Sequence, residues 1–136
     1  MKRTSIVLSL FIVFSMVLSA CGGGSGSGAT TNITTAMSDF KFDPAEWTVP
    51  AGEEITLQIS NTGQLEHDWI LMMSPATIPF DTDDEANVVT EVEQEPGENT
   101  SFKFTAPSEP GDYQVVCGIP GHLEAGMKGT LHVVEQ

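Results

Sequence analysis

The stretch ITLQIS, residues 55–60, alternates apolar and polar side chains with a period of two. Because successive side chains of a β-strand point to opposite faces, this pattern predicts a strand with one buried face. The same parity recurs near the C-terminus, where Tyr113, Val115 and Cys117 share one face and Gln114 takes the other. The period is two and not 3.6, so the sequence predicts an all-β fold.

Turn-forming residues separate the apolar segments at regular intervals, as in Pro50-Ala51-Gly52 and Asn61-Thr62-Gly63. Short strands divided by such turns predict an antiparallel Greek-key β-sandwich of about seven to eight strands. The segment 74–99 is less regular, and a short helix over residues 83–95 is one interpretation of it. We expect strands near residues 32–37, 46–49, 54–60, 67–72, 100–105, 112–117 and 128–134.

The chain is long enough for one domain and strongly acidic. Its 136 residues are 40% hydrophobic, and five Lys and Arg stand against 19 Asp and Glu, giving a formal charge of −14. One hydrophobic core is expected at this length. Binding to nucleic acid is excluded, because phosphate recognition needs clustered cations.

The N-terminus has the pattern of an export signal. Lys2 and Arg3 precede an apolar run over residues 6–18, which is shorter than the roughly 20 residues of a membrane span. The run ends in Leu18-Ser19-Ala20-Cys21, which resembles the bacterial lipobox. We therefore expect a lipoprotein signal peptide over 1–20, a lipidated Cys21 with a Gly/Ser-rich tether over 21–31, and a folded domain over 32–136.

Lipidation would place the exported protein on the outer face of the bacterial cytoplasmic membrane. Two acyl chains on the Cys21 thiol would supply the double hydrophobic signal that stable anchoring requires. An ordinary cleavage site with Cys21 present by chance is the alternative.

With Cys21 lipidated, Cys117 is the one thiol left, and an unpaired thiol in an exported protein needs a reason. The sequence CGIPGHLEAGM, residues 117–127, spaces Cys117, His122 and Met127 at five-residue intervals on a loop rich in glycine. His67 begins an upstream strand and offers a second imidazole. Two His, one Cys and a distant Met form the ligand set of a blue-copper electron-transfer site.

Other interpretations use the same residues. Zinc prefers four strong tetrahedral ligands and hard cations prefer carboxylates, so neither suits a thioether. Each residue taken singly fits a metal-free sandwich, with Met and Cys as core residues and His at the surface. A Cys117–His122 nucleophile pair is formally possible but leaves His67 and Met127 without a role.

The loop CGIPGHLEAGMKGTLHV and the upstream QLEHDW resemble the cupredoxins, and the lipobox and glycine tether resemble the auracyanins in particular. The resemblance implies one type 1 copper ion bound by His67, Cys117, His122 and Met127 at one end of an eight-stranded sandwich. The family often has Asn after the first ligand histidine, where it ties the two ligand loops together. Asp68 stands there in this chain and can accept an N–H but not donate one, which bears on how the thiolate is tuned.

The ligand set indicates an electron carrier and not an enzyme. Protein fills every ligand position, and three histidines in all are too few for a multicopper oxidase or a nitrite reductase. The alternatives are a copper-binding lipoprotein for storage or delivery and a metal-free interaction module.

The resemblance to auracyanins also implies the partners of a monomeric, membrane-anchored carrier. The donor would be a quinol-oxidising complex and the acceptor a cytochrome or an oxidase. Pro120 and Leu123 flank His122, and we expect them to form an apolar docking rim around an imidazole edge. The acidic run over 81–98 is either a solvated face or a surface that steers a cationic partner.

Overall fold

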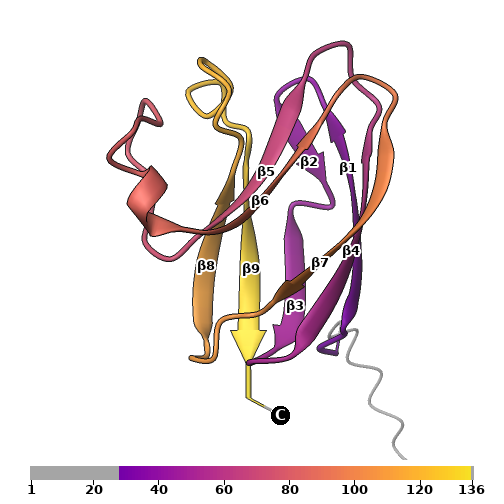
Figure 1. Ribbon diagram of the computed structural model, residues 1–136, viewed down its shortest axis with the longest axis vertical. Coiled ribbons are helices and arrows are strands. Elements are labelled where there is room, and N and C mark those ends of the chain that lie inside the picture. Colours follow the sequence, from indigo (N-terminus) through magenta and orange to yellow (C-terminus); the bar gives the residue numbers. More distant parts are fainter. Residues whose placement is uncertain (1–27, 136) are drawn as a thin grey trace, which may run out of the picture.

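Two facing β-sheets make up the protein in the computed structural model, which describes residues 28–135 (Figure 1). The predicted signal peptide over 1–20 and the predicted lipidation site Cys21 lie outside the described residues. The fold is all-β, as predicted, and a single 3₁₀ turn, η1 (Glu85–Asn87), is the helical element among residues 28–135. The strands are β1 (Asn32–Ser38), β2 (Lys41–Asp43), β3 (Glu46–Pro50), β4 (Glu54–Asn61), β5 (His67–Met72), β6 (Val88–Gln94), β7 (Asn99–Thr105), β8 (Gly111–Val116) and β9 (Lys128–Val134).

One sheet has the strand order β2-β1-β4-β7 and the other β3-β9-β8-β5-β6. The predicted Greek-key sandwich is antiparallel except in two pairs, since β1 pairs with β4 and β3 pairs with β9 in parallel. Each of these pairs joins strands that do not follow one another in the sequence. The alternation within one segment predicts a strand but does not specify which other strand it pairs with or in which register.

The period-two patterns bury one face of each sheet against the other. Ile55, Leu57 and Ile59 of β4 are almost completely buried, as the alternation predicts. Trp47 and Trp69 face them from the other sheet, with ring centroids 5.8 Å apart in an edge-on arrangement. Full burial of side chains of this size contributes roughly 1.5–3 kcal/mol each, so this layer is the main source of stability.

The segment predicted as a short helix over 83–95 is instead η1 followed by strand β6. In β6, Glu91 and Glu93 are exposed, whereas Val92 between them is half-buried and Gln94 after them is buried. This is strand alternation on the edge of the five-stranded sheet, with β-branched residues at its start. The acidic residues obscured the pattern because Glu91 and Glu93 interrupt the apolar and β-branched residues of the strand.

The folded part begins earlier than expected. Thr30 donates its backbone N–H to the carbonyl of Thr48 (3.1 Å), and the carbonyl of Thr31 accepts from Thr56 (2.8 Å). These two residues, expected at the end of the tether, are thus attached to the sandwich. Within residues 28–135, no helix has the length and apolar character needed to cross a bilayer.

The loops that matter for function gather at one end of the sandwich. The loop between β8 and β9, the start of β5 and the turn between β1 and β2 all lie at the upper end in Figure 1. Since β5 and β8 are neighbours in one sheet, with Ile70 opposite Val116, the residues just outside these strands come together there.

Candidate metal centre

Cys117 directly follows β8 and is completely buried. The strand alternation that buries Val115 also turns the Cys117 side chain inward, into the space between the sheets. It is the single free cysteine among the described residues. A buried thiol at the mouth of a sandwich is thus fixed by the strand that carries it.

The loop 117–127 closes on itself through backbone hydrogen bonds. The N–H of Met127 donates to the carbonyl of His122 (3.0 Å), and the N–H of Cys117 donates to the carbonyl of Met127 (3.3 Å). Gly121 and Gly126 have φ of 89° and 100°, a region that glycine enters without steric cost. The glycines therefore allow the tight folding that brings the ends of the loop together.

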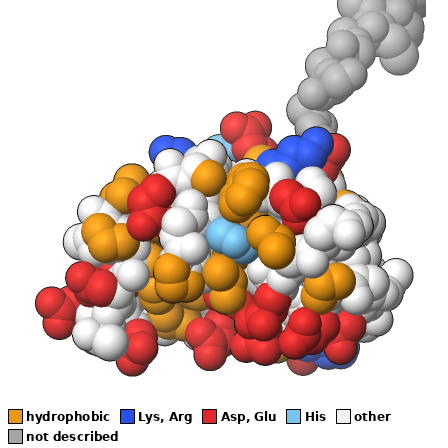
Figure 2. Space-filling model, turned by 90° about the horizontal axis from the view of Figure 1, so that it is seen from above, with side chains coloured by type: hydrophobic (Ala, Val, Ile, Leu, Met, Phe, Trp, Pro, Cys, Tyr) orange, Lys and Arg blue, Asp and Glu red, His pale blue; other side chains and the backbone are white. Residues whose placement is uncertain are grey.

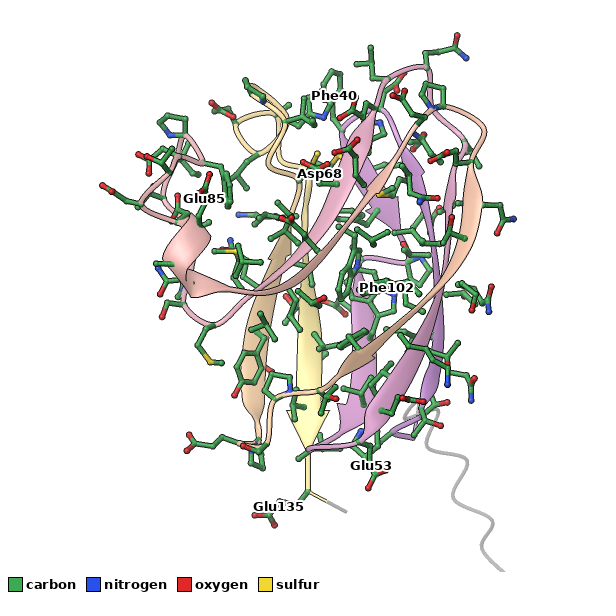
Figure 3. All side chains as sticks on the ribbon, viewed as in Figure 1. Phe40, Glu53, Asp68, Glu85, Phe102 and Glu135 are labelled. Carbon is green, nitrogen blue, oxygen red and sulfur yellow. The ribbon has the colours of Figure 1, made fainter. Side chains whose placement is uncertain are left out.

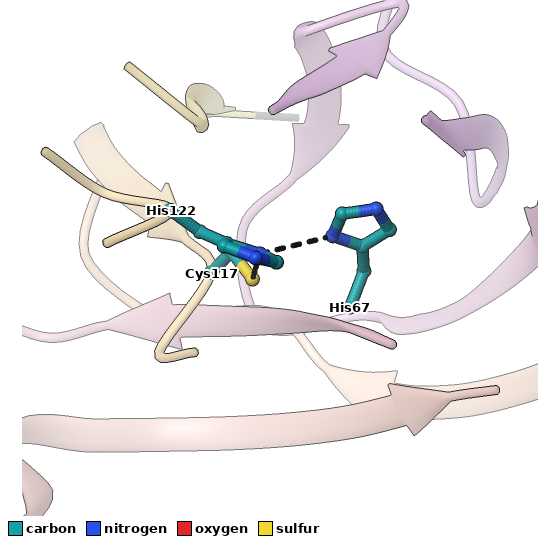
Figure 4. A group of neighbouring side chains, drawn as sticks. All are labelled: His67, Cys117 and His122. Atoms are coloured by element: carbon teal, nitrogen blue, oxygen red, sulfur yellow. Dashed lines mark hydrogen bonds between the residues drawn. The ribbon is translucent and has the colours of Figure 1, made fainter. Parts of the chain in front are cut away.

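His67 reaches the same place from the first position of β5 and is completely buried. Its Nδ1 lies 3.2 Å from Nδ1 of His122, and Nδ1 of His122 lies 3.3 Å from Sγ of Cys117 (Figure 4). One ligand atom from each of the three residues lies within 4.8 Å of the other two. The structure thus brings together three of the four residues that the sequence predicts as ligands.

Met127, the fourth predicted ligand, is completely buried in the main hydrophobic core. Its backbone is bonded to both Cys117 and His122, as described above, so it lies at the edge of the cluster. A thioether in this position can act as a weak additional donor.

Burial opposes charge at Cys117 and His122. It raises the pKa of the Cys117 thiol to about 11, although N–H groups of Asp68 and Ile119 favour the thiolate. It also lowers the pKa of His122, with the neighbouring His67 acting in the same direction. Burial therefore favours the uncharged thiol of Cys117 and the uncharged imidazole of His122.

Asp68 links the two segments that carry the donors. Its backbone N–H donates to Sγ of Cys117 (3.4 Å), and its carboxylate accepts from the N–H of Gly118. Burial, with further contributions from Glu93 and Glu66, raises the pKa of Asp68 to about 6. The Asp68 carboxylate hence ties β5 to the loop after β8 although it only accepts a hydrogen bond and does not donate one.

The docking role expected for Leu123 is wrong. Leu123 is only 2% exposed and packs with Ile70, Met72 and Val116 in a second small core. It points inward because the compact loop leaves its apolar side chain over that cluster. Pro120, the other residue expected on the rim, is exposed.

Phe40 is the apolar residue at this surface that sequence analysis missed. It is 43% exposed, and its ring meets the His122 ring edge-on, with centroids 5.1 Å apart and planes at 88°. It belongs to the two-residue turn between β1 and β2 and has φ of 66°, which bulky residues rarely adopt. No motif marks such a turn, so only the fold brings it to His122.

Acidic side chains gather beside the apolar surface at this end of the molecule. Figure 2 shows hydrophobic side chains around a histidine at the surface, with carboxylates grouped along one margin. Glu66, Asp68 and Glu93 offer oxygens within 4.8 Å of one another. The pKa of Glu66 is raised chiefly by repulsion from Glu93, so this cluster carries unneutralised negative charge.

The donor set fits a copper ion. Two imidazole nitrogens and one thiol, all buried, converge in one cluster, and the backbone of Met127 is hydrogen-bonded to Cys117 and His122. Soft sulfur ligands and imidazoles together suit copper, whereas a hard cation would need the carboxylates that lie outside this cluster.

Comparison with known proteins agrees with this geometry. Residues 29–134 match the family described as "Copper binding proteins, plastocyanin/azurin family". Auracyanin-A of Chloroflexus aurantiacus is 32% identical, over 94% of this chain and 95% of that protein. The copper-resistant cuproprotein CopI of Rubrivivax gelatinosus is 29% identical, over 81% of this chain and 70% of that one.

Among solved structures, dithionite-reduced auracyanin from Roseiflexus castenholzii superimposes with a TM-score of 0.67 at 29% identity. The match covers 79% of this chain and 99% of that one. The resemblance to auracyanins inferred from the ligand loop is thereby confirmed for the whole sandwich.

Proposed function

The chain belongs to the plastocyanin/azurin family of copper-binding proteins, and we propose that it carries single electrons between redox complexes at a membrane. Its cofactor is one copper ion. The observation that carries the proposal is the convergence of Cys117, His67 and His122 in a buried cluster at the end of the sandwich. We assign these residues as the strong ligands and Met127 as the weak one.

Fixed donors favour electron transfer over other uses of copper. Backbone hydrogen bonds close the loop 117–127, and β5 holds His67 opposite it. A bound copper ion supplies one-electron chemistry by alternating between Cu(I) and Cu(II). Donors that are already in place need little rearrangement between the two states, and N–H groups from Asp68 and Ile119 support the thiolate in both.

Burial also argues against catalysis at this site. Cys117 and His67 are completely buried, and His122 is 5% exposed, so a substrate has no direct access to the donors. The small exposed part of His122 is instead a suitable exit for an electron. Phe40 packs against that ring and Pro120 is exposed nearby in the loop, so both belong to the surface that we propose for docking.

We further propose that the protein is a monomer anchored through Cys21 to the outer face of the cytoplasmic membrane. The lipobox-like sequence at residues 18–21 supports the anchor. The donor would be a quinol-oxidising complex and the acceptor a cytochrome or an oxidase, on the strength of the auracyanin relationship. Cys21→Ser, with Ser19→Ala as control, should give a soluble or unprocessed product in place of the lipidated protein, whereas a wild-type protein that partitions into the aqueous phase of a detergent extraction would contradict the anchor.

Copper handling is the second candidate, and the similarity to CopI, a copper-resistant cuproprotein, favours it. A protein for storage or delivery must release its ion, whereas an electron carrier must keep it through many redox cycles. The same ligands could serve either purpose, so the rate of copper loss distinguishes them.

Repeated chemical reduction and reoxidation in the presence of a competing Cu(I) chelator tests the proposal. An electron carrier should retain its one copper ion per chain through many cycles. Transfer of the ion to the chelator within the first reductions would instead favour copper handling. Zinc-loaded protein is a suitable control for metal loss that does not depend on redox cycling.

A further inference from the structure

We propose that Asp39 is a positioning residue for the copper site, which holds His67 in the tautomer that can bind metal and adds a negative charge behind it. Asp39 lies in the two-residue turn between β1 and β2, in the sheet opposite to the one that carries His67. Its Oδ1 lies 3.4 Å from Nε2 of His67. The proposal rests on His67 being a ligand, as proposed above.

The two nitrogens of His67 face different surroundings. Nδ1 points into the donor cluster, 3.2 Å from Nδ1 of His122, so its lone pair is the one available to a metal. The ring proton must then be on Nε2, and this buried atom has no aligned hydrogen-bond partner in the structure. A buried N–H without an acceptor is costly, which makes the nearby carboxylate important.

Asp39 is held in place independently of His67. The same oxygen, Oδ1, accepts the backbone N–H of Gln64 at 3.0 Å. Thr62 donates both its N–H and its hydroxyl to the carbonyl of Met37, at 2.8 and 3.0 Å. The end of β1 is thereby joined to the segment that leads into His67, and the carboxylate cannot swing far from Nε2.

Gly63 makes room for this contact. A Cβ added at Gly63 would lie 2.5 Å from Oδ1 of Asp39 and 3.1 Å from Nε2 of His67. Gly63 is not in the left-handed region, so the glycine is required here for space and not for backbone conformation. A substitution at Gly63 can thus disturb the contact between Asp39 and His67 without removing either residue.

A carboxylate at Nε2 has a predictable effect on the metal. A second partner that accepts from the far nitrogen of a ligating imidazole fixes its tautomer and raises its basicity. Negative charge near the site also favours the more positive oxidation state. Asp39 should therefore lower the reduction potential of the copper, relative to a chain with a neutral residue there.

The tautomer is tested on the metal-free protein by long-range ¹H–¹⁵N NMR of the His67 ring at neutral pH. The Nε2–H form should predominate in the wild type and in Asp39→Asn, whose amide oxygen can still accept. In Asp39→Ala the ratio of Nε2–H to Nδ1–H should fall about three- to tenfold, because the buried Nε2–H then loses its nearest carboxylate. An unchanged ratio in Asp39→Ala would overturn the positioning role.

The charge is tested by the reduction potential of the copper-loaded protein. Asp39→Asn should raise the potential more than Glu124→Gln, a matched control because both carboxylates act electrostatically on His122. Equal shifts in the two variants would mean that only long-range charge matters and would contradict the proposal.

Gly63→Ala provides a test that keeps the charge. It should raise the reduction potential, as Asp39→Asn does. The double variant should shift the potential by less than the sum of the two single shifts. Gly111→Ala is the control, because a Cβ there meets nothing closer than 3.7 Å. Additive effects of Gly63→Ala and Asp39→Asn would show that the contact is not the cause.

If no copper site forms at all, the proposed function fails, but the tautomer measurement still reports on Asp39.

Discussion

Met127 is the donor whose replacement the site should tolerate best. Leucine has a similar volume, so Met127→Leu should change the free energy of unfolding of the metal-free protein by less than about 1.5 kcal/mol. Removal of the thioether should destabilise bound Cu(II) more than bound Cu(I), so the reduction potential should rise. Denaturant unfolding and redox titration measure the two effects, and a lowered potential would contradict the assignment of Met127 as a ligand.

Leu123 and Leu65 lie at the same end of the molecule but differ in burial, so substitutions of the two distinguish an effect on packing from an effect at the surface. Leu123 is 2% exposed and Leu65 is 44% exposed. Leu123→Lys should lower the free energy of unfolding by more than about 3 kcal/mol, because it places an unpaired charge in a small apolar core, whereas Leu65→Lys should change it by at most about 0.5 kcal/mol. Urea denaturation of both variants checks this, and a stable Leu123→Lys would contradict the observed packing.

At the scale of single residues, sequence predicted the donors but not what orients them. Cys117, His122 and His67 could be found because a Cys, a His and a Met at five-residue intervals, with a second His upstream, form a rare pattern. Asp39 and Phe40 could not, because their roles depend on a contact between opposite sheets. Leu123 was misplaced because an apolar residue in a short loop is equally compatible with a surface rim and a small core.

The parallel pair β3–β9 depends on a glycine. A Cβ at Gly129 would lie 2.5 Å from the carbonyl oxygen of Ala45 and 3.0 Å from the Trp47 ring. Gly129→Ala should therefore destabilise the fold by about 1–3 kcal/mol, the usual range for overpacking. Thermal unfolding would measure it, with Gly111→Ala as the uncrowded control, and equal stability of the two variants would contradict the close packing.

The segment between β5 and β6 is organised by a buried carboxylate. Asp84 accepts from the N–H and the hydroxyl of Thr77, at 3.0 and 2.8 Å, and from the N–H of Asp81 at 3.2 Å. These bonds lower the pKa of Asp84 below its usual 3.8, the Thr77 N–H contributing most. Its ionised form is thus favoured by folding.

A lowered folded-state pKa gives stability that is present above pH 3.8 and is lost as pH falls through the folded value. Asp84→Asn should be less stable than the wild type at neutral pH, and the difference should shrink in acid. Comparing urea unfolding of the two proteins at several pH values tests this. A difference that stays constant into acid would rule out a contribution from ionised Asp84.

At the scale of elements, alternation predicted seven strands close to their observed positions. β2 was missed because three residues are too few for a periodic pattern. β6 was missed because Glu91 and Glu93 interrupt its apolar and β-branched residues. The parallel pairings lie beyond what one segment of sequence can specify, since they depend on which distant strands become neighbours.

Carboxylates lie at both ends of the part of the molecule that the structure describes. Figure 3 shows Asp68 and Phe40 at the end with the metal centre, and Glu53 and Glu135 at the opposite end. Glu91 and Glu93 of β6 are exposed, and Glu93 lies opposite Asp68 of β5. This acidic margin beside the docking surface is suited to a cationic partner.

Neutralising Glu91, Glu93 and Glu95 to glutamine should slow electron transfer to the native partner at low salt but not at high salt. Exposed charges are screened beyond a Debye length of about 8 Å at physiological ionic strength. Phe40→Ser, which alters the proposed apolar docking surface without changing the charge, should slow transfer at both. Stopped-flow kinetics would compare these with Glu109→Gln/Glu135→Gln at the far end, and a salt-independent effect of the triple variant would refute steering.

A spectroelectrochemical titration of the copper-loaded protein tests the central claim most directly. The oxidised form should show an intense visible band from charge transfer between the Cys117 thiolate and copper, at one copper per chain. The band should disappear and return in a single reversible one-electron transition, and Cys117→Ser should lack it while retaining the folded sandwich. A copper-loaded protein with no visible band, or one whose band survives in Cys117→Ser, would contradict the account.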